Sequence, residues 1–492
     1  MIQKKRQIVI RWSVICLGLA ILCLASYHFA LRISTVDSRP TPPTRETAIW
    51  SGLVGISKDR MKVVFAVHDR AMAHNPLPLM CSRAFWKIDL SLGRVKILDE
   101  GHIIAIGEWH YLEDKEKILY RRRDNVGEPS DLCLVDLNGK VEVLARAVAD
   151  TEVIISPDER FIAYSRVSLE NNTTRGTYII DLNNPRQQVG PLDFTPISWT
   201  EDNSQLLVQS EEGLSVIELP NGQTRMNIQI PEGKCISDIK VAPNRKFFCF
   251  TTKSMDEKGT PGPSEQVHLA SLDLLTEIGH SRPFSGGFWS PNGRYLVYGP
   301  PKRGPNKGDS TLTVFDMKNH EEFTIVVRPQ YPFDGSHADL HSDGDDMSPL
   351  TWSPDGKCLI LIEHQIEYPK GRKRGVNCDV IWVIDLDERR IVQEFANAFY
   401  PHPIVFSPDG HYLAAKAHYT EGNDEVSNGW ILDVKTGERR RLELSMVTPV
   451  AWLTQETVLW TTRQPWMGES VPKLELFETN LIDKSAKQIF PK

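Results

Sequence analysis

Apolar and polar positions along this chain follow a repeated two-part pattern. The first part is an apolar or aromatic residue, a Ser-Pro-Asp-Gly-like turn and a short apolar run. It is clearest at residues 289–298, 352–362 and 406–415. Looser copies begin at Ser57, Trp109, Ser156, Trp199, Ala242 and Trp452. Short apolar runs bounded by turn residues predict β-strands joined by tight turns.

The second part of the pattern is another apolar run that ends in an acidic or amide residue followed by an aliphatic one. The endings are Asp89-Leu90, Asp136-Leu137, Asp181-Leu182, Glu218-Leu219, Asp273-Leu274, Asp316-Met317, Asp385-Leu386, Asp433-Val434 and Asn480-Leu481. Two linked markers that recur nine times predict nine units, each a four-stranded antiparallel blade with connections of variable length.

The residue types of the turn have a physical reason. Proline presets φ near −65° at the second turn position, Asp or Asn bonds the local backbone, and Gly accepts a positive φ. The apolar runs are continuous and do not strictly alternate with polar residues, which is typical of strands that are covered on both faces.

The phrase Trp-Ser-Pro-Asp-Gly at residues 352–356, followed by an apolar strand and then a strand ending in Asp385-Leu386, resembles the TolB-like or PD40 (WD40-like) β-propeller repeat. The resemblance covers residues 47–492 and implies an all-β chain with a single propeller. Families of this type usually have six to eight blades, so nine units leave a propeller of either eight or nine. The resemblance specifies a fold and not a function.

Residues 12–31 are twenty residues without a formal charge. As a helix they would span about 30 Å, the thickness of a bilayer core. Lys4, Lys5, Arg6 and Arg11 precede this run, and the positive-inside rule places them in the cytoplasm. We therefore expect a cytoplasmic basic segment (1–11), a transmembrane signal-anchor (12–31), a proline-rich spacer (32–46) and an exported propeller (47–492).

The exported part is expected to be periplasmic or extracellular. A cleaved signal peptide is the alternative, because Cys23 to Ala25 offers small residues for a peptidase, and the propeller would then be secreted. The spacer contains three prolines at 40, 42 and 43, which favour a stiff, extended segment.

Charge argues against a nucleic-acid partner for the exported part. The first 45 residues hold seven Lys and Arg and one Asp, which leaves 50 basic against 63 acidic residues and a net charge of −13. Six cysteines lie beyond the apolar run. We expect most of them to be free thiols, with Cys235 and Cys249 the one plausible pair of hairpin neighbours, whereas Cys358 and Cys378 fall at opposite ends of one strand pair.

The sequence contains no G-x-S-x-G, H-E-x-x-H, Walker A or EF-hand motif. The long connections fall on one side of the predicted blades: Val67–Ser82, Arg166–Gly176, Lys253–Glu265, Pro300–Asp309, His364–Asn377 and His418–Asn428 between second and third strands, and Arg328–Pro349 between units. Because function in rigid scaffolds concentrates in elaborated loops, this side is the expected binding face.

Two sets of side chains on this face have candidate chemistry. His337, Asp339, His341, Asp343 and Asp345, together with His402, are of the types that hold a divalent metal or Ca²⁺, although a solvated acidic loop and a structural histidine are the alternatives. Lys302, Arg303, Lys370, Arg372, Lys373 and Arg374 are suited to gripping an acidic sugar or a carboxylate-bearing protein, or are exposed loop charge.

The sequence therefore favours a non-catalytic platform that binds a protein or glycan partner in the cell envelope, without a cofactor. The alternative is a metal-assisted lyase or hydrolase of acidic carbohydrate, with His337, His341 and His402 as ligands.

Overall fold

The structure is a computed structural model in which the chain divides into two compact units, Met1–Pro42 and Pro43–Lys492. It describes residues 48–491 except 70–80, 106–108, 125–127, 150, 152, 168–173, 211–212, 220–222, 230–231, 256–260, 273–276, 282–286, 304–309, 328–349, 368–375, 399–403, 422–423, 446, 463–474 and 483–484. Within these residues no helix has the length and hydropathy needed to cross a membrane. The predicted anchor, 12–31, lies outside them.

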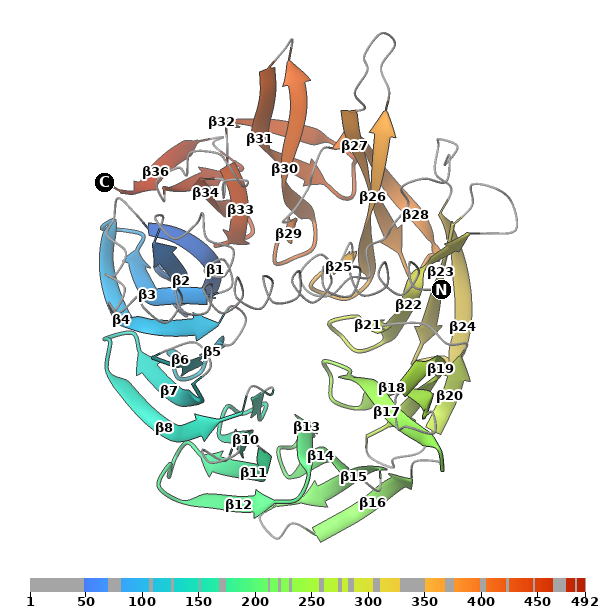
Figure 1. Cartoon of the computed structure of the whole chain (residues 1–492). Coiled ribbons are helices and arrows are strands. Elements are labelled where there is room, and N and C mark those ends of the chain that lie inside the picture. Colours follow the sequence, from blue (N-terminus) through green and yellow to red (C-terminus); the bar gives the residue numbers. More distant parts are fainter. Residues whose placement is uncertain are drawn as a thin grey trace, which may run out of the picture. The chain divides into compact units, whose positions relative to one another are not determined.

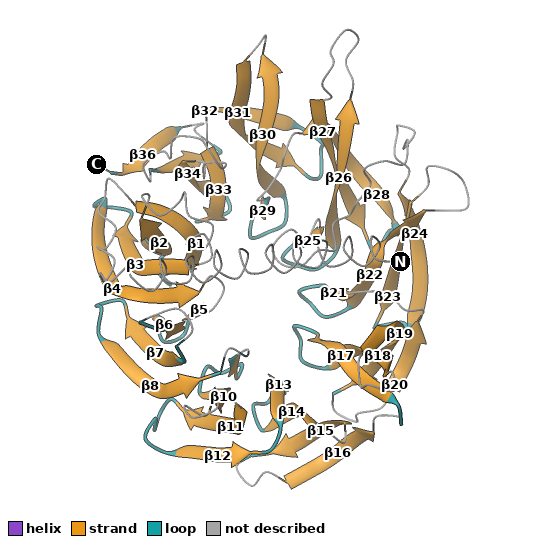
Figure 2. Cartoon of the chain, viewed as in Figure 1, coloured by secondary structure: helices purple, strands orange, loops and turns teal. Residues whose placement is uncertain are grey.

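All the regular elements of the described chain are β-strands, joined by turns and loops (Figure 2). They are β1 (Ala48–Ile56), β2 (Lys62–Asp69), β3 (Cys81–Asp89), β4 (Arg94–Ala105), β5 (Trp109–Leu112), β6 (Lys117–Arg122), β7 (Ser130–Asp136), β8 (Val141–Val148), β9 (Ile154–Ile155), β10 (Phe161–Val167), β11 (Thr174–Asp181), β12 (Gln188–Leu192), β13 (Thr195–Trp199), β14 (Gln205–Ser210), β15 (Gly213–Glu218), β16 (Gln223–Gln229), β17 (Lys234–Val241) and β18 (Phe247–Met255).

The second half of the chain continues with β19 (Pro261–Ser271), β20 (Glu277–Ser281), β21 (Gly287–Trp289), β22 (Tyr295–Arg303), β23 (Ser310–Asp316), β24 (Glu321–Val327), β25 (Leu350–Trp352), β26 (Cys358–Glu367), β27 (Val376–Asp385), β28 (Arg390–Ala398), β29 (Val405–Phe406), β30 (Tyr412–Glu421), β31 (Asp424–Asp433), β32 (Arg439–Ser445), β33 (Val447–Trp452), β34 (Thr457–Thr462), β35 (Leu476–Asn480) and β36 (Ala486–Phe490).

These 36 described strands pair antiparallel in nine consecutive groups of four, from β1–β4 to β33–β36. Seven groups are separate sheets, and the second and third are joined into one eight-stranded sheet through the pairing of Arg166 with Val148. The strands of each group are called a to d in chain order. The prediction of an all-β chain built from four-stranded antiparallel sheets is confirmed.

Consecutive groups pack face to face through hydrophobic side chains. Alternate residues of one strand serve two interfaces: in β26, Leu359 and Leu361 pack against the sixth group, whereas Ile360 and Ile362 pack against the eighth. A strand covered on both faces needs apolar residues at successive positions, which explains the continuous apolar runs. Burial of each such aliphatic side chain stabilises the folded state by about 1.5–3 kcal/mol relative to leaving it exposed.

Nine hydrophobic clusters of described residues fill the interfaces between neighbouring groups. Eight join consecutive groups, and the ninth joins Trp86 and Ile88 of the first group to Leu459 and Phe490 of the last. The second unit of the chain therefore closes on itself. In Figure 1 its groups follow one another around a ring, with the a strands, such as β13, β21 and β25, innermost.

The two ends of every group differ in their connections. The a–b and c–d turns lie at one end, which we call the turn side, and the b–c connections and the links to the next group lie at the other, the loop side. In five of the a–b turns, a serine or threonine hydroxyl donates to the carboxylate two residues on and accepts from the backbone amide five residues on. Ser353 does so with Asp355 at 2.6 Å and Cys358 at 2.8 Å.

A left-handed residue closes these turns. The predicted glycines Gly293, Gly356 and Gly410 have φ of 66°, 70° and 72°. In the looser copies non-glycine residues adopt the same conformation, among them Arg60, Glu159, Asn203 and Arg245, with φ of 53° to 63°. A left-handed non-glycine residue costs about 1–2 kcal/mol, so these positions need compensating contacts.

The second sequence marker forms the c–d turn. The Asp433 carboxylate accepts from the amides of Lys435 and Thr436, and the amide of Val434 donates to the carbonyl of His411 near the a–b turn. The marker chosen in the fifth unit, Asp273-Leu274, is wrong. Ser271 pairs with Phe247, and Leu272 donates to the Lys246 carbonyl, so these two residues hold the equivalent positions.

Candidate functional site

The turn side is held together by hydrogen bonds between neighbouring groups. In the a–b turns of the first five groups the left-handed residue is not glycine, and its side chain reaches back to the preceding group. Arg60 donates to the Leu453 carbonyl at 2.6 Å, which links the first group to the last. Glu159 accepts from the Asp114 amide, and Asn203 accepts from the Asp158 amide at 3.1 Å. These bonds compensate for the unfavourable backbone conformation.

At Gly293 and Gly356, the side chain of the preceding turn occupies the space that a Cβ would need. Asn244 donates to the carbonyls of Asn292 and Gly293 at 3.3 Å, and Asn292 donates to the Asp355 carbonyl at 2.8 Å. A Cβ at Gly356 would lie 2.7 Å from the Asn292 side chain. These two turns carry Asn in the position of the more frequent Asp because a carboxylate has no proton to donate.

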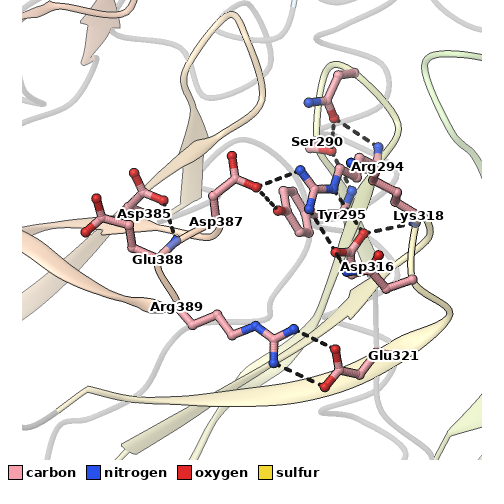
Figure 3. Close-up of polar contacts among 12 residues, drawn as sticks. Ser290, Arg294, Tyr295, Asp316, Lys318, Glu321, Asp385, Asp387, Glu388 and Arg389 are labelled. Carbon is pink, nitrogen blue, oxygen red and sulfur yellow. Dashed lines mark hydrogen bonds and ion pairs between the residues drawn. The ribbon is translucent and has the colours of Figure 1, made fainter.

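A charged network joins the sixth and seventh groups on the same side (Figure 3). Arg294 makes two bonds of 3.0 Å to the Asp316 carboxylate and one of 2.6 Å to Asp387, which also accepts from the Tyr295 hydroxyl at 2.8 Å. Arg389 and Glu321 form a second two-bond pair. Sequence reasoning missed Asp387, because only the folded chain brings it to Arg294.

The network favours the ionised carboxylates. The hydrogen bond from Tyr295, with a further one from Arg294, lowers the pKa of Asp387, and the Arg389 guanidinium lowers the pKa of Glu321. Asp316 is 2% exposed and its oxygens also accept from Lys318 and Asn319. All these groups are paired within the protein, so the turn side is built for cohesion between groups.

The loop side has a different construction. The described parts of the predicted loops 364–377 and 418–428 are strand: Glu367 of β26 pairs with Val376 of β27, and Glu421 of β30 pairs with Asp424 of β31. Figure 1 shows both hairpins projecting beyond the neighbouring sheets. The prediction of loop was wrong for residues 364–367, 376–377, 418–421 and 424–428, because cross-strand pairing overrides the local propensity of the polar residues there.

The predicted binding residues lie mostly outside the described chain. Lys302 and Arg303 lie at the end of β22, paired with Thr311 and Ser310, and so on the loop side. Outside the described residues are Lys370, Arg372, Lys373 and Arg374 of the basic set and His337, Asp339, His341, Asp343, Asp345 and His402 of the metal set. Within the described residues no group of three or more His, Cys, Asp or Glu is arranged to hold a metal ion.

The described thiols Cys133, Cys235, Cys249 and Cys358 are free, as expected. Burial raises the pKa of Cys133, Cys249 and Cys358 to about 12, so these three are not thiolates near neutral pH. The suggested Cys235–Cys249 pairing is wrong, because Cys235 pairs with Lys253 and Cys249 pairs with Lys240 in the β17–β18 ladder.

One polar cluster on the loop side was not singled out from the sequence. Arg121 and Ser130 share a face of the second group with Leu119 and Leu132, which pack against the third group. Arg166 lies across this interface. We call the layer formed by His110, Arg121, Ser130 and Arg166 the polar cap, since it covers the loop-side end of the hydrophobic cluster between the two groups.

The members of the polar cap are held from several sides. Arg121 donates to the Ala149 carbonyl. The Arg166 guanidinium donates to the Gln188 side chain at 2.6 Å and lies 4.4 Å from the centre of the Tyr178 ring. Gln188 in turn donates to the Leu144 carbonyl of the second group at 3.1 Å, so the cap spans the interface.

The neighbouring strand is irregular beside the cap. In β8, Val148 pairs with Ser130 and Ala145 with Leu132, so Arg146 and Ala147 form a bulge in which Ala147 has φ of 55°. Burial and the charge of Arg121 lower the pKa of His110, which keeps this imidazole neutral near pH 7. The only sequence signal for the cap is the Arg121–Arg123 run at the end of β6.

No protein-family model and no curated protein sequence matches this chain. Among solved structures, it is similar to an oligogalacturonate lyase in complex with manganese (14% identity, TM-score 0.41, 70% of this chain and 91% of that one). It is also similar to a eukaryotic initiation factor (13%, 0.48, 83% and 94%) and to a dihydro-heme d1 dehydrogenase (15%, 0.39, 84% and 77%).

Proposed function

We propose that this protein is a membrane-anchored, exported β-propeller that acts as a non-catalytic platform for a protein or glycan partner in the cell envelope. The partner binds on the loop side, at the hairpins β26–β27 and β30–β31. The single observation that supports this choice is the difference between the two sides: the turn side uses its polar groups to bond neighbouring groups, whereas two hairpins project from the loop side (Figure 1).

The basic residues of the loop side define the partner's chemistry. Lys370, Arg372, Lys373 and Arg374 fall in the connection between β26 and β27, and Lys302 and Arg303 end β22. Guanidinium and ammonium groups bind carboxylates through charge-assisted hydrogen bonds. The partner is therefore an acidic glycan or a protein surface that presents carboxylates, and not a nucleic acid, which the net charge of the exported part disfavours.

The finer architecture is part of the proposal. The nine groups are nine blades of one propeller of the TolB-like, PD40 type. This is supported by the recurrent a–b turn and c–d marker and by the hydrophobic cluster that joins the last group to the first. Families of this kind share a fold and carry unrelated functions, which is why the binding face is argued from its own residues.

The membrane anchor is tested by fractionation of cells that express the full-length chain. We expect the chain to sediment with membranes and to be released only by detergent, and a variant without residues 1–31 to be soluble. Release of the full-length chain by salt or alkali alone would contradict the anchor, and a mature chain that begins near residue 26 would show a cleaved signal peptide instead.

Partner binding is tested by capture of carboxylate-bearing glycans and envelope proteins on the purified full-length chain. The triple variant Arg372→Glu, Lys373→Glu, Arg374→Glu is expected to lose at least tenfold in affinity, the loss of one charge-assisted hydrogen bond or more. The matched control is Lys318→Glu, Lys357→Glu, Lys435→Glu, an equal change of charge at exposed positions of the turn side, and it is expected to bind normally. Equal binding by both variants would place the interface elsewhere.

Metal analysis of the same purified chain distinguishes the binding platform from the metal-assisted enzyme. That alternative needs a bound divalent metal lost on His402→Ala or on replacement of His337 and His341. Stoichiometric metal in the purified chain, together with cleavage of an acidic polysaccharide, would favour the lyase or hydrolase over the platform.

A further inference from the structure

We propose that the polar cap between the second and third groups binds a small oxyanion, the carboxylate or phosphate group of a ligand that enters from the loop side. The site consists of Arg121, Ser130 and Arg166, with His110 beside them. This site lies between the second and third groups, whereas the hairpins β26–β27 and β30–β31 belong to the seventh and eighth. It does not depend on the partner proposed above.

Two donors of the cap carry this inference, because they are buried and unused. The Ser130 side chain is fully buried and its hydroxyl has no hydrogen-bond partner among the described residues. The Nε of Arg166 is also buried and without a partner there. A buried donor left without a partner costs about 1–3 kcal/mol, and more when it is charged, so a ligand that supplies acceptors removes two such penalties at once.

The two donors face the same space. Ser130 and Arg166 both pair with Val148, one from each side of β8. Side chains of directly paired residues in a sheet project from the same face. The unused hydroxyl and the unused Nε therefore belong to side chains that project from the same face, on either side of Val148, at the loop-side end of the hydrophobic cluster to which Val148 belongs.

The charge of the cap selects an anion. Arg121 is 7% exposed and Arg166 is stacked against Tyr178, so both guanidiniums lie where the effective dielectric constant is lower than in water and attraction to an anion is stronger. Oxyanions accept hydrogen bonds and donate none when ionised, which matches donors of this kind. The bulge at Arg146 and Ala147 interrupts the β8 ladder beside the cap, a feature common next to binding sites.

The test measures anion binding by the purified full-length chain, with malonate and inorganic phosphate as probes in chloride buffers of equal ionic strength. Isothermal titration is expected to show one bound anion, and thermal unfolding a rise in Tm with anion concentration. Arg166→Gln is expected to lose at least tenfold in affinity. Binding of malonate alone identifies a carboxylate ligand, and binding of phosphate alone a phosphate ester; either result supports the site.

Two further variants keep the test decisive if Arg166→Gln folds poorly. Ser130→Ala removes the unused hydroxyl, so its Tm without anion is expected to equal or exceed that of the wild type, while its affinity for the anion falls. Arg146→Gln is the control, because Arg146 is 80% exposed and bonds Asp131 instead. The proposal is overturned if neither probe binds, which would leave a buried water as the partner of Ser130. It is also overturned if Arg166→Gln and Ser130→Ala both bind the anion as the wild type does, which would indicate an adventitious ion only.

Discussion

Single residues account for the two sequence markers. In most a–b turns a serine or threonine joins the acidic or amide side chain that caps the turn to the first amide of the b strand, and in most c–d turns an acidic residue caps the following amides. In the a–b turns of the first seven groups, the left-handed residue is either a glycine against which the side chain of the preceding turn packs, or a longer residue whose side chain reaches back to that turn. Each choice joins neighbouring groups as well as closing a turn.

Replacement of Ser353 by alanine tests the turn serine. Ser353 is 1% exposed, so Ser353→Ala leaves the Cys358 amide without its side-chain acceptor and is expected to cost about 1–3 kcal/mol in the free energy of unfolding. Urea unfolding measures it. Ser91→Ala, which removes an exposed bond to Asp89 in a c–d turn, is the control and should change the free energy by less than about 0.5 kcal/mol.

Replacement of Gly356 by alanine separates backbone strain from the contact between turns. Gly356 and Gly233 have φ of 70° and 74°, but a Cβ at Gly233 would meet nothing within 4 Å, whereas one at Gly356 would collide with Asn292. Gly233→Ala is expected to cost about 1–2 kcal/mol. Gly356→Ala should cost about 1 kcal/mol more in urea unfolding, through the lost Asn292 bond, and equal costs would show that this bond contributes nothing.

At the scale of strands and sheets, the contacts between groups divide by side. Hydrophobic clusters lie between all neighbouring groups, and the turn side adds charged and neutral hydrogen bonds, of which the network of Arg294, Asp316 and Asp387 is the densest (Figure 3). The loop side instead carries the long hairpins and the polar cap. The turn side therefore fixes how the groups sit against one another.

The charged network predicts a loss of stability in acid. The pKa values of Asp387 and Glu321 are lower in the folded protein than in the unfolded chain. Their contribution is therefore fully present above the unfolded values, about 4, and is lost as the pH falls through the folded values. Thermal unfolding from pH 6 down to about pH 2 should show a fall in Tm that is shallower in Arg294→Met. Parallel curves for the two proteins would contradict this role.

At the scale of the whole described unit, closure of the ring distinguishes this protein from an open array of repeats. In an open array each repeat contacts only its sequence neighbours, and the terminal repeats are weakest. Here the first and last groups share one hydrophobic cluster, in which Trp86 and Phe490 are each 1% exposed. The last strand is therefore part of the core and not a frayed end.

Phe490→Ala tests ring closure. Removal of this buried ring is expected to cost about 3–5 kcal/mol and to reduce hydrogen-exchange protection in β2 and β3 as well as in β34 and β35, because the first and last groups lose their interface together. Val326→Ala, at a position 45% exposed on an outer strand, is the control. Loss of protection confined to the last group would indicate an open array.

Local patterns in the sequence are enough to define the repeated units of this protein. The turn serines, the left-handed glycines and the Asp-aliphatic endings act over a few residues, so their spacing is sufficient to predict four-stranded antiparallel sheets and most of their turns. The prediction failed where local signals are weak: the fifth c–d turn is at Ser271, and the described parts of the segments 364–377 and 418–428 pair as strands.

Contacts between residues that are distant in the sequence are seen only in the tertiary structure. Residues of different groups meet in the closure of the last group on the first, the bond from Arg60 to Leu453, the pairing of Arg294 with Asp387, and the pairing of Arg166 with Val148. The repeat pattern of the sequence does not predict such contacts, because they depend on how the faces of neighbouring sheets pack and on the register at which the sheets are joined.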